Sequence, residues 1–589
     1  MTGESGRKRA FLSNGLVAAI EVDGSIDWFT APRFDSQSIF ARLLDERTGG
    51  HFSIRPEGGY RVSSSYVGKS LILKSVFSAE EGRLEVIDFL PIGIPSIVRI
   101  FNSEVPFIVE INPTFNYGMI NPDVEYMGNG VSFRNAQSKE SFDVSVSGEY
   151  TRIHDGMLKF RPGKGSIMGL YSKDYRYGLF SMKAFVYPSA EDALANSLHR
   201  WKGQMESVDR VKNFKSLYYR SLAVVIGLTY APSGGIIAAP TTSLPAIQGK
   251  GNNWDYRYVW IRDAAYAAEA LSKIGYLTWA RRAISFMLNV IDPSSKSFDH
   301  PLFEIDGTAP PVEEAVGWLS GYRGSLPVRI GNAAYTHVQM DTEGAFVEAL
   351  YNYFVMSKDL RYIKESMWAI DAIGKWCMNG WPRKSISLWE ERTTPKHYVH
   401  TKLMNWMAID RIGKLKLAVG DVGAAEHYRR TASKVKDDIL KNGFSREIGS
   451  FVKYYGSDEV DSSLLTLPLY DFIDANDPRF TSTFDTIIER LMDRKGMLMR
   501  TEHDYEGENS HPFTLVNTWL ARVYIKRGET RKAQAAIKNM EKYATDLMLF
   551  GERVNVKTRE PLGNFPQLFP HAGLLAAISE YDKHVRSKG

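Results

Sequence analysis

The sequence predicts a protein of class β plus α, in which an all-β sandwich domain precedes a closed ring of helical hairpins. The chain has 589 residues, which is enough for two or more domains. Up to about residue 190, short apolar runs alternate with turn residues, as they do in strands. Beyond about residue 215, apolar residues recur with a helical period. The change of period predicts the order of the two parts.

Composition indicates a soluble globular protein. The chain is 44% hydrophobic and 24% charged, and its net charge of +5 comes without a dense basic tract, so we expect no nucleic-acid partner. Its one cysteine, Cys377, cannot form an intrachain disulfide, which fits a reducing compartment. We find neither a signal peptide nor an apolar run of about 18 residues, and therefore expect a cytoplasmic protein without a membrane partner.

The strand signals begin with a hairpin. Asp23-Gly24 lies between LVAAIEV and SIDWFTAP, which is a strong short-range hairpin signal. Further strand-like runs follow at short intervals: SLILKSVFS, RLEVIDFLPI, SIVRIFNS, PFIVEINPTF, FDVSVSGEYTRI and GMLKFRPGKG. We expect residues 1–190 to form an N-terminal β-sandwich domain and residues 191–214 to form a helical linker. The exposed sheet edges of such a domain are compatible with a homodimer.

The second half reads as repeated pairs of helices. Residues 215–589 hold about six hairpins, each an apolar helix, a short turn and a more amphipathic helix. The hairpins are not similar enough in sequence for an ordinary solenoid, and their long loops are rich in Trp, Gly, Pro and charge. We therefore expect a closed double ring with the loops at one end. An open solenoid that docks other proteins would leave these loops unexplained.

The first such loop opens a helix with an arginine and an aspartate. In NNWDYRYVWIRDAAYAAEAL, Arg262 and Asp263 stand directly before the helical pattern. Helix capping by Asp263 is one interpretation. The aromatic residues around the pair favour a second one, because sugars offer apolar faces to rings and hydroxyl edges to polar groups. These aromatic residues are Trp254, Tyr256, Tyr258 and Trp260.

The second loop, GWLSGYRGSLPVRIGNAAYTHVQMDTEGAFVEAL, places Asp341 at another helix start. Taken alone, this pattern favours a helix cap.

The third loop, SLWEERTT, places Glu390 and Glu391 side by side behind Trp389. Neighbouring side chains point about 100° apart on a helix and to opposite faces on a strand, so one pocket can use both only if the backbone bends. A charged surface turn is the alternative. His397 and His400 follow, but their spacing is not HExxH and no cysteine joins them, so we expect no metal.

The fourth loop, RTEHDYEGENSHPFTLVNTWLARVY, carries Asp504, Glu506 and Glu508 ahead of Pro512 and an apolar helix. An acidic loop at the positive end of a helix dipole explains this pattern. A carboxylate on such a loop can also activate a water molecule.

In this order, WIRDAA, GNAAYTHVQMD, SLWEER and GENSHPFTLVNTWLARVY resemble glycoside hydrolase family 15, the glucoamylase family with related trehalases and glucodextranases. The resemblance covers nearly the whole chain, and the opening FLSNGLVAAIEVDGSIDWFTAPRFDS is typical of prokaryotic members. It implies an N-terminal super-β-sandwich followed by an (α/α)6 barrel.

The resemblance also implies roles for individual carboxylates. Glu390 matches the general acid, and Glu391 matches the residue that holds substrate hydroxyls. The general base falls on Glu508, after Gly507, with Glu506 as the fallback.

The remaining matches concern the substrate. Arg262 and Asp263 resemble the clamp on the non-reducing end of the terminal sugar, and Asp341 matches a Gln-x-Asp position. We further expect three aromatic residues to bind substrate: Trp260, Tyr256 and Trp389.

The implied reaction is hydrolysis with inversion at the anomeric carbon, for which the two carboxyl groups must lie about 6.5–9.5 Å apart. The resemblance favours an exo-acting α-glucosidase of glucoamylase type that releases β-glucose from α-1,4-glucans such as maltodextrin, glycogen or starch. An α,α-trehalase that uses the same carboxylates is the alternative, and a non-catalytic carbohydrate-binding scaffold is a third. The chemistry requires no cofactor and no metal.

Overall fold

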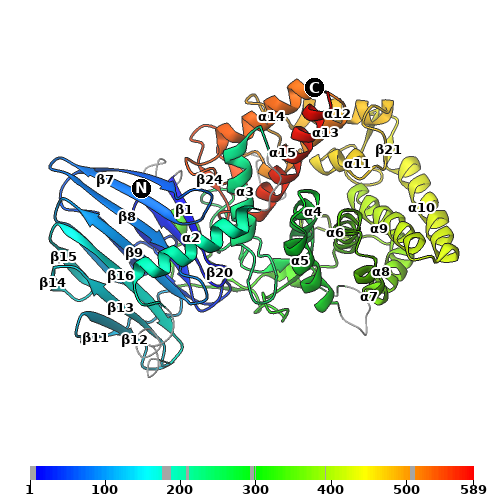
Figure 1. The fold of residues 1–589 in the computed structure, drawn as a ribbon. Coiled ribbons are helices and arrows are strands. Elements are labelled where there is room, and N and C mark those ends of the chain that lie inside the picture. Colours follow the sequence, from blue (N-terminus) through cyan, green and yellow to red (C-terminus); the bar gives the residue numbers. More distant parts are fainter. Residues whose placement is uncertain are drawn as a thin grey trace.

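The structure is a computed structural model that describes residues 8–174, 187–206, 211–291, 298, 300–391, 393–503 and 511–588. Two layers of strands form one end of the molecule and a ring of helices forms the other, as Figure 1 shows. The last long strand ends at Ser172, and the first helix of the ring begins at Lys215. The predicted order of a β-sandwich and a helical domain is therefore confirmed.

The sandwich consists of two antiparallel sheets, each of eight strands. The first sheet contains, in spatial order, β1 (Arg9–Ser13), β2 (Ala18–Val22), β3 (Ser25–Thr30), β5 (His51–Pro56), β10 (Phe107–Asn112), β15 (Met157–Phe160) and β14 (Tyr150–His154), with β4 (Ser38–Phe40) paired to β3. The second contains β11 (Asp123–Met127), β12 (Gly130–Arg134), β13 (Ser141–Ser147), β16 (Gly163–Ser172), β9 (Ser96–Ser103), β8 (Arg83–Phe89), β7 (Leu73–Ala79) and β6 (Tyr60–Tyr66).

The predicted hairpin at Asp23-Gly24 joins β2 to β3. Both turn residues have positive φ, 50° and 87°, as a two-residue hairpin turn with the twist of the flanking strands requires. This prediction is confirmed.

A buried ion pair ties the two sheets together. Arg99 on β9 lies opposite Asp88 on β8, and its Nε donates to Asp88 Oδ1 at 2.7 Å. The same guanidinium donates to the carbonyl oxygens of Phe52 and Gly24, which belong to the first sheet and its hairpin. Both charged side chains are fully buried. One cation thus satisfies polar groups from both layers of the sandwich.

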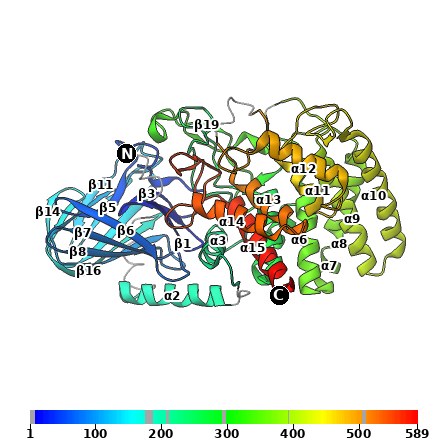
Figure 2. The same cartoon turned by 90° about the horizontal axis from the view of Figure 1, so that it is seen from above.

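Six inner helices close into a ring. They are α4 (Ile261–Lys273), α6 (Thr342–Ser357), α9 (Val399–Ala418), α11 (Thr466–Leu469), α13 (Thr514–Lys526) and α15 (Leu568–Lys588). Each contacts the next in this order, and α15 returns to pack against α4. The predicted (α/α)6 barrel is confirmed by this closure, which Figure 2 shows from a second direction.

The outer helices alternate with the inner ones along the chain. They are α3 (Lys215–Gly227), α5 (Leu277–Asn289), α8 (Met367–Gly380), α10 (Val422–Asn442), α12 (Pro478–Leu491) and α14 (Thr530–Tyr543), with the short α7 (Leu360–Glu365) ahead of α8. Because an outer helix precedes each inner one and the chain reverses direction between them, all inner helices begin at the same end of the ring. The long loops that precede them therefore gather there.

The smaller elements lie outside the two layers and the ring. α2 (Ala190–Glu206) packs against β9. The loops carry short paired strands, namely β17 (Val259–Trp260) with β18 (Leu302–Phe303), β19 (Glu314–Ala315) with β20 (Arg329–Ile330), β21 (Phe444–Ser445) with β22 (Ser450–Phe451), and β23 (Arg553–Val554) with β24 (Pro561–Leu562). They also carry the 3₁₀ turns η2 (Tyr322–Gly324), η3 (Ala333–Thr336) and η4 (Ser462–Leu465).

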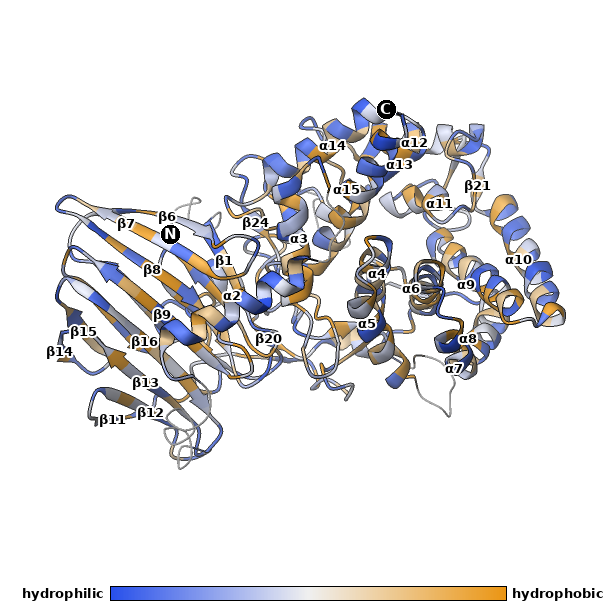
Figure 3. Cartoon of the chain, in the orientation of Figure 1, coloured by the Kyte–Doolittle hydropathy of each residue, from blue (hydrophilic) through white to orange (hydrophobic). Residues whose placement is uncertain are grey.

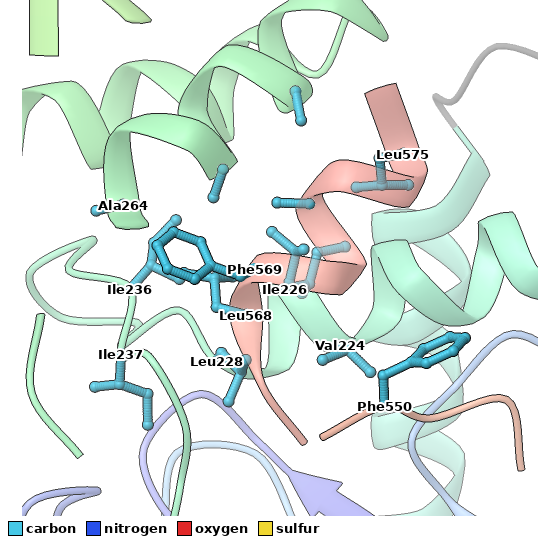
Figure 4. Packing of buried hydrophobic residues seen from close by; sticks show 14 of the residues in the cluster. Val224, Ile226, Leu228, Ile236, Ile237, Ala264, Phe550, Leu568, Phe569 and Leu575 are labelled. Atoms are coloured by element: carbon cyan, nitrogen blue, oxygen red, sulfur yellow. The ribbon is translucent and has the colours of Figure 1, made fainter. Parts of the chain in front are cut away.

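Inner and outer helices differ in their buried faces. The buried residues of α10, Tyr428, Ala432, Val435 and Ile439, recur every three or four positions and mark one face. In contrast, α9 is buried around most of its circumference. In Figure 3, α10 and α14 accordingly show hydrophilic and hydrophobic residues along the same helix. Figure 4 shows the apolar packing at the start of α15, where Phe569 lies close to Ile236 and Leu568.

Within the described ranges, no helix is both long and apolar enough to cross a membrane.

The Arg99 pair gives a stability prediction. Arg99→Met removes the counter-charge of a fully buried carboxylate, and we expect it to lower the free energy of unfolding by about 3–5 kcal/mol. Arg161→Met is the matched control, because the Arg161–Glu149 pair is largely exposed. Denaturant unfolding followed by tryptophan fluorescence measures both. Equal unfolding midpoints for the two variants would contradict the assigned role of Arg99.

Candidate active site

Arg262 is the buried cation at the loop end of the ring. It lies in the first turn of α4, and its side chain is 6% exposed. Its Nη1 donates to Gln339 Oε1 at 2.9 Å, and its Nη2 donates to Glu390 Oε1 at 3.3 Å. The guanidinium carbon lies 5.6 Å from the centroid of the Phe569 ring. Three loops that are far apart in sequence therefore converge on one side chain.

Glu390 lies where the backbone bends. Its φ is +56°, in the left-handed region, and its N–H donates to the carbonyl of Ser387 at 3.0 Å. A positive φ in a residue other than glycine is uncommon and is often found at functional sites. The bend that two adjacent carboxylates need in order to share a pocket is thus present, and both Glu390 and Glu391 line one cavity.

One oxygen of Glu390 accepts three hydrogen bonds. Trp260 Nε1 and Gln339 Nε2 each donate to Oε1 at 2.9 Å, beside the donor from Arg262. The side chain nevertheless stays 24% exposed. Since Oε1 is occupied as an acceptor, Oε2 is the oxygen left to carry a transferable proton.

Glu391 is held by the protein. Lys453 Nζ lies 2.7 Å from its Oε1, and the hydroxyls of Ser387 and Tyr398 donate to its Oε2 at 3.3 Å. Its side chain is 8% exposed. The role in gripping substrate hydroxyls stays a prediction, and these contacts show that the carboxylate is fixed before any substrate arrives.

Trp389 forms part of the cavity wall. Its Nε1 donates to Asp461 Oδ2 at 2.8 Å, and its ring packs edge-on against Phe513 at 5.5 Å between centroids. Burial raises the pKa of Asp461 to about 6 against the opposing effects of Ser463 and Lys453. The hydrogen bond to Asp461 and the contact with Phe513 thereby hold the indole in one orientation.

The two aspartates near Arg262 do not cap their helices. Asp263 lies inside the first turn of α4, whose capping position is Trp260, and Asp341 makes no side-chain capping bond to α6. Instead, Asp263 Oδ2 lies 3.3 Å from Arg262 Nη2, and Asp341 Oδ2 lies 3.9 Å from Nη1. The capping interpretation is therefore wrong for Asp263, whereas Asp341 stands at the N-cap position of α6 without a capping hydrogen bond from its side chain.

Asp263 faces the cavity, whereas Asp341 lies behind Arg262. Asp263 is among the lining residues, and Asp341 is fully buried and is not. Burial and, to a lesser extent, the charge of Glu390 raise the pKa of Asp263 to about 7 despite Arg262. Burial also raises the pKa of Asp341. Neither Asp263 Oδ2 nor the Asp341 oxygens accept a hydrogen bond from a described residue.

A further carboxylate, Glu552, lies in the same cavity. Tyr256 donates from its hydroxyl to Glu552 Oε1 at 2.8 Å, and Gln567 Nε2 lies 3.4 Å from the same oxygen. Tyr256 also packs edge-on against Trp260, 5.6 Å between ring centroids. As with Glu390, one oxygen is occupied and Oε2 is left for another partner.

Two compartments meet between these carboxylates. The Arg262 compartment is lined by Trp260, Arg262, Asp263, Phe513, Gln567 and Phe569, among others. The His337 compartment is lined by Asn252, Trp254, Asn332, His337, Glu391 and Arg553, among others. Five residues line both: Tyr256, Trp389, Glu390, Arg500 and Glu552. Glu390 and Glu552 thus stand at the junction of two adjoining spaces.

The predicted base and its fallback, Glu508 and Glu506, lie outside the described residues, so their assignment stays a prediction. Sequence reasoning did not identify Glu552, although the signal was present. Gly551-Glu552 is also a Gly-Glu pair, and it precedes the last inner helix as Gly507-Glu508 precedes the inner helix before it. Arg500, His337 and Gln567 were likewise not singled out.

The two histidines considered as metal ligands have other surroundings. His397 stacks on Tyr455 at 5.7 Å between ring centroids, and burial together with Arg262 lowers the pKa of His400 to about 3. Among the residues that the structure describes, no group of three or more His, Cys, Asp or Glu side chains is arranged to hold a metal ion.

Asp263 gives a pH prediction. Its pKa is raised from 3.8 to about 7 in the folded state, so the native state binds this proton more tightly than the unfolded state. The contribution of this group to stability is therefore favourable below pH 4 and is lost as the pH rises to about 7. We expect Asp263→Asn to gain stability relative to wild type over this window, by up to about 1.4 kcal/mol per pH unit. Denaturant unfolding at several pH values measures the difference, and parallel profiles would contradict it.

Comparison with known proteins shows the family. Residues 212–536 match the model of glycosyl hydrolases family 15, and residues 6–154 match a model described as trehalase-like, N-terminal. Trehalase 2 of Sulfolobus acidocaldarius is 47% identical over 98% of this chain and 99% of its own length. The trehalase of Thermoplasma volcanium is 31% identical over 97% of this chain and 93% of its own.

The fold agrees with a solved structure. A bacterial glucoamylase complexed with acarbose superposes with a TM-score of 0.76 over 98% of this chain and 94% of that one, at 15% identity. At this identity the likeness concerns the fold alone. The match to residues 212–536 and the relatives aligned over nearly the whole chain show that the chain belongs to glycosyl hydrolase family 15.

Proposed function

We propose that this glycosidase is an inverting α,α-trehalase that hydrolyses trehalose to two molecules of glucose. The observation that carries the proposal is the junction of two compartments at Glu390 and Glu552, because a disaccharide bound with one sugar in each compartment would have its glycosidic bond beside both carboxylates. The full-length relatives named as trehalases support trehalose as the substrate. The proposal therefore replaces the glucoamylase interpretation, with α-1,4-glucans as substrates, by the trehalase alternative.

The Arg262 compartment receives the sugar that is attacked. Sugars present hydroxyl edges and apolar faces, and this compartment offers the Arg262–Asp263 pair together with the rings of Trp260 and Phe569. Asp263 lines this compartment and pairs with Arg262 at 3.3 Å, and in this proposal its carboxylate also accepts a hydrogen bond from a substrate hydroxyl. Such pairing offsets the cost of burying the carboxylate.

Glu390 acts as the general acid in this proposal. Its Oε2 carries the proton, because Oε1 already accepts from Trp260, Arg262 and Gln339. The proton moves to the glycosidic oxygen as the bond between that oxygen and C1 breaks. The sugar in the His337 compartment then leaves as neutral glucose.

Glu552 acts as the general base. Its Oε1 is held by Tyr256, which leaves Oε2 to accept a proton from a water molecule as the water oxygen bonds to C1 on the opposite face. Inversion requires the two carboxyl groups to lie about 6.5–9.5 Å apart, with room for that water. A base at Glu552 places both groups on the described wall of one cavity.

The products test the reaction. Both anomeric carbons of trehalose are α, so inversion gives one β-glucose from the attacked sugar and one α-glucose from the leaving sugar. We expect proton NMR at early times to show the two anomers in equal amounts. Hydrolysis of maltose, maltotriose or isomaltose in place of trehalose would contradict the proposed substrate, and α-glucose alone would contradict inversion.

Three isosteric variants test the carboxylates. Glu390→Gln and Glu552→Gln each remove one proton-transfer group, and we expect kcat on trehalose to fall at least about 100-fold in both. Glu508→Gln is the matched comparison, with an expected change below about threefold. Loss of activity in Glu508→Gln beside an active Glu552→Gln would restore the base that the sequence predicted.

His337 tests the leaving-group side. His337 lines the compartment for the leaving sugar together with Trp254 and Asn332. Its Nδ1 is buried without a hydrogen-bond partner among the described residues. We expect His337→Ala to lower kcat/KM on trehalose by up to about tenfold, the value of one hydrogen bond. On α-glucosyl fluoride, whose leaving group is too small to fill the compartment, we expect no change. An equal loss on both substrates would contradict this placement.

A further inference from the structure

Arg9 of the N-terminal sandwich reaches into the helical half of the molecule. It lies on β1, and its side chain is 3% exposed. Its guanidinium carbon lies 4.8 Å from the centroid of the Tyr322 ring, and its Nη2 lies 3.8 Å from Glu560 Oε1. Within the described part of the chain, Glu560 is the carboxylate with which Arg9 forms an ion pair.

Glu560 is the centre of this contact. The Tyr322 hydroxyl donates to its Oε1 at 3.0 Å, and Arg323 Nη1 donates to its Oε2 at 3.0 Å. Both carboxylate oxygens are therefore engaged, and the side chain is 6% exposed. We call Arg9, Tyr322, Arg323 and Glu560 the Glu560 clamp.

The Glu560 clamp holds the hairpin that carries Glu552. Glu560 directly precedes β24, whose partner strand β23 begins directly after Glu552. The turn between the strands is closed by a hydrogen bond from Asn555 N–H to the Glu560 carbonyl at 3.0 Å. Only the short paired strands β23 and β24 thus separate the held residue Glu560 from Glu552.

Glycines make this hairpin a close backbone contact. A Cβ added at Gly563 would lie 2.9 Å from the Cβ of Glu552, and one added at Gly551 would lie 2.5 Å from the carbonyl oxygen of Leu562. With no side chains between the two segments, a shift at Glu560 moves Glu552 directly. The geometry therefore couples the clamp to the carboxylate at the junction of the compartments.

We propose that Arg9 is a positioning residue for the reaction, which holds Glu552 in place through Glu560. The inference rests on the proposed function, in which Glu552 is the general base. Displacement of a catalytic group by about 1 Å costs on the order of 100-fold in rate. Substrate binding depends mainly on the Arg262 compartment, which the clamp does not touch, so loss of Arg9 lowers kcat while KM changes little.

Arg9→Met in the full-length protein tests this inference. We expect kcat on trehalose, or on whichever disaccharide the wild type hydrolyses, to fall about 10- to 100-fold with KM within about twofold. Arg9→Lys keeps the charge and recovers part of the rate. Arg47→Met is the matched control, because Arg47 is exposed and lines, together with Arg9 and Arg323, a cavity of about 350 Å³ beside the clamp. The contacts of Glu560 described above do not involve Arg47. It keeps the wild-type kcat.

A double variant separates positioning from general instability. In the Glu552→Gln background the base is already lost, so Arg9→Met changes the residual rate less than about twofold. An equal loss in both backgrounds would mean a purely structural effect and would overturn the inference. Glu560→Gln keeps the side-chain size and is measured in the same way, so that the test stands if Arg9→Met fails to fold.

The outcomes also distinguish this inference from the proposed function. Wild-type kcat in Arg9→Met beside an inactive Glu552→Gln overturns the positioning role alone. Wild-type activity in Glu552→Gln overturns the assigned base, and the inference falls with it.

Discussion

The buried guanidinium of Arg262 is the constraint on which the loop end of the ring depends. A charge taken out of water must be compensated by ionic partners and hydrogen bonds, or it costs several kcal/mol. Arg262 obtains this compensation from Asp263 in its own helix, from Gln339 and Asp341 ahead of α6, and from Glu390 ahead of α9. The Phe569 ring of α15 adds a cation–π contact. Compensation of one cation thus requires the same convergence of loops that forms the cavity.

The two oxygens of each carboxylate at the junction, Glu390 and Glu552, differ in their hydrogen bonding. Glu390 and Glu552 both line the cavity, and each has one oxygen fixed by neighbouring donors. Fixed donors of this kind need no reorganisation during the reaction, which is how preorganised sites lower a barrier. The left-handed backbone conformation of Glu390 is the conformational strain that accompanies this arrangement. It directs the side chain of Glu390 away from that of Glu391, which Lys453 holds.

Periodicity in the sequence was enough to predict the architecture, because burial imposes a period of two on strands and of 3.6 on helices regardless of family. The hairpin at Asp23-Gly24 and the closed ring of helices followed from such patterns. Local sequence patterns predicted the candidate active site less completely than the fold. They placed Arg262 and Glu390 on loops, and the structure brings the two together. The family resemblance assigned the base to Glu508, with Glu506 as the fallback, and Glu552 was passed over although it also follows a glycine ahead of an inner helix. The described structure places Glu552 in the same cavity as Glu390, which local patterns could not show.

With trehalose as the proposed substrate, the difference between the two compartments determines which glucose unit is attacked. The two glucose units of trehalose are chemically identical, so nothing in the substrate decides which anomeric carbon is attacked. The protein decides, because one compartment holds the Arg262–Asp263 pair and the other holds His337, Asn332 and Trp254. In the proposed reaction, water attacks the sugar beside Arg262, and the other glucose leaves with the proton from Glu390. A symmetric substrate is thereby bound by an asymmetric site, and this asymmetry arises because different loops of the ring line the two compartments.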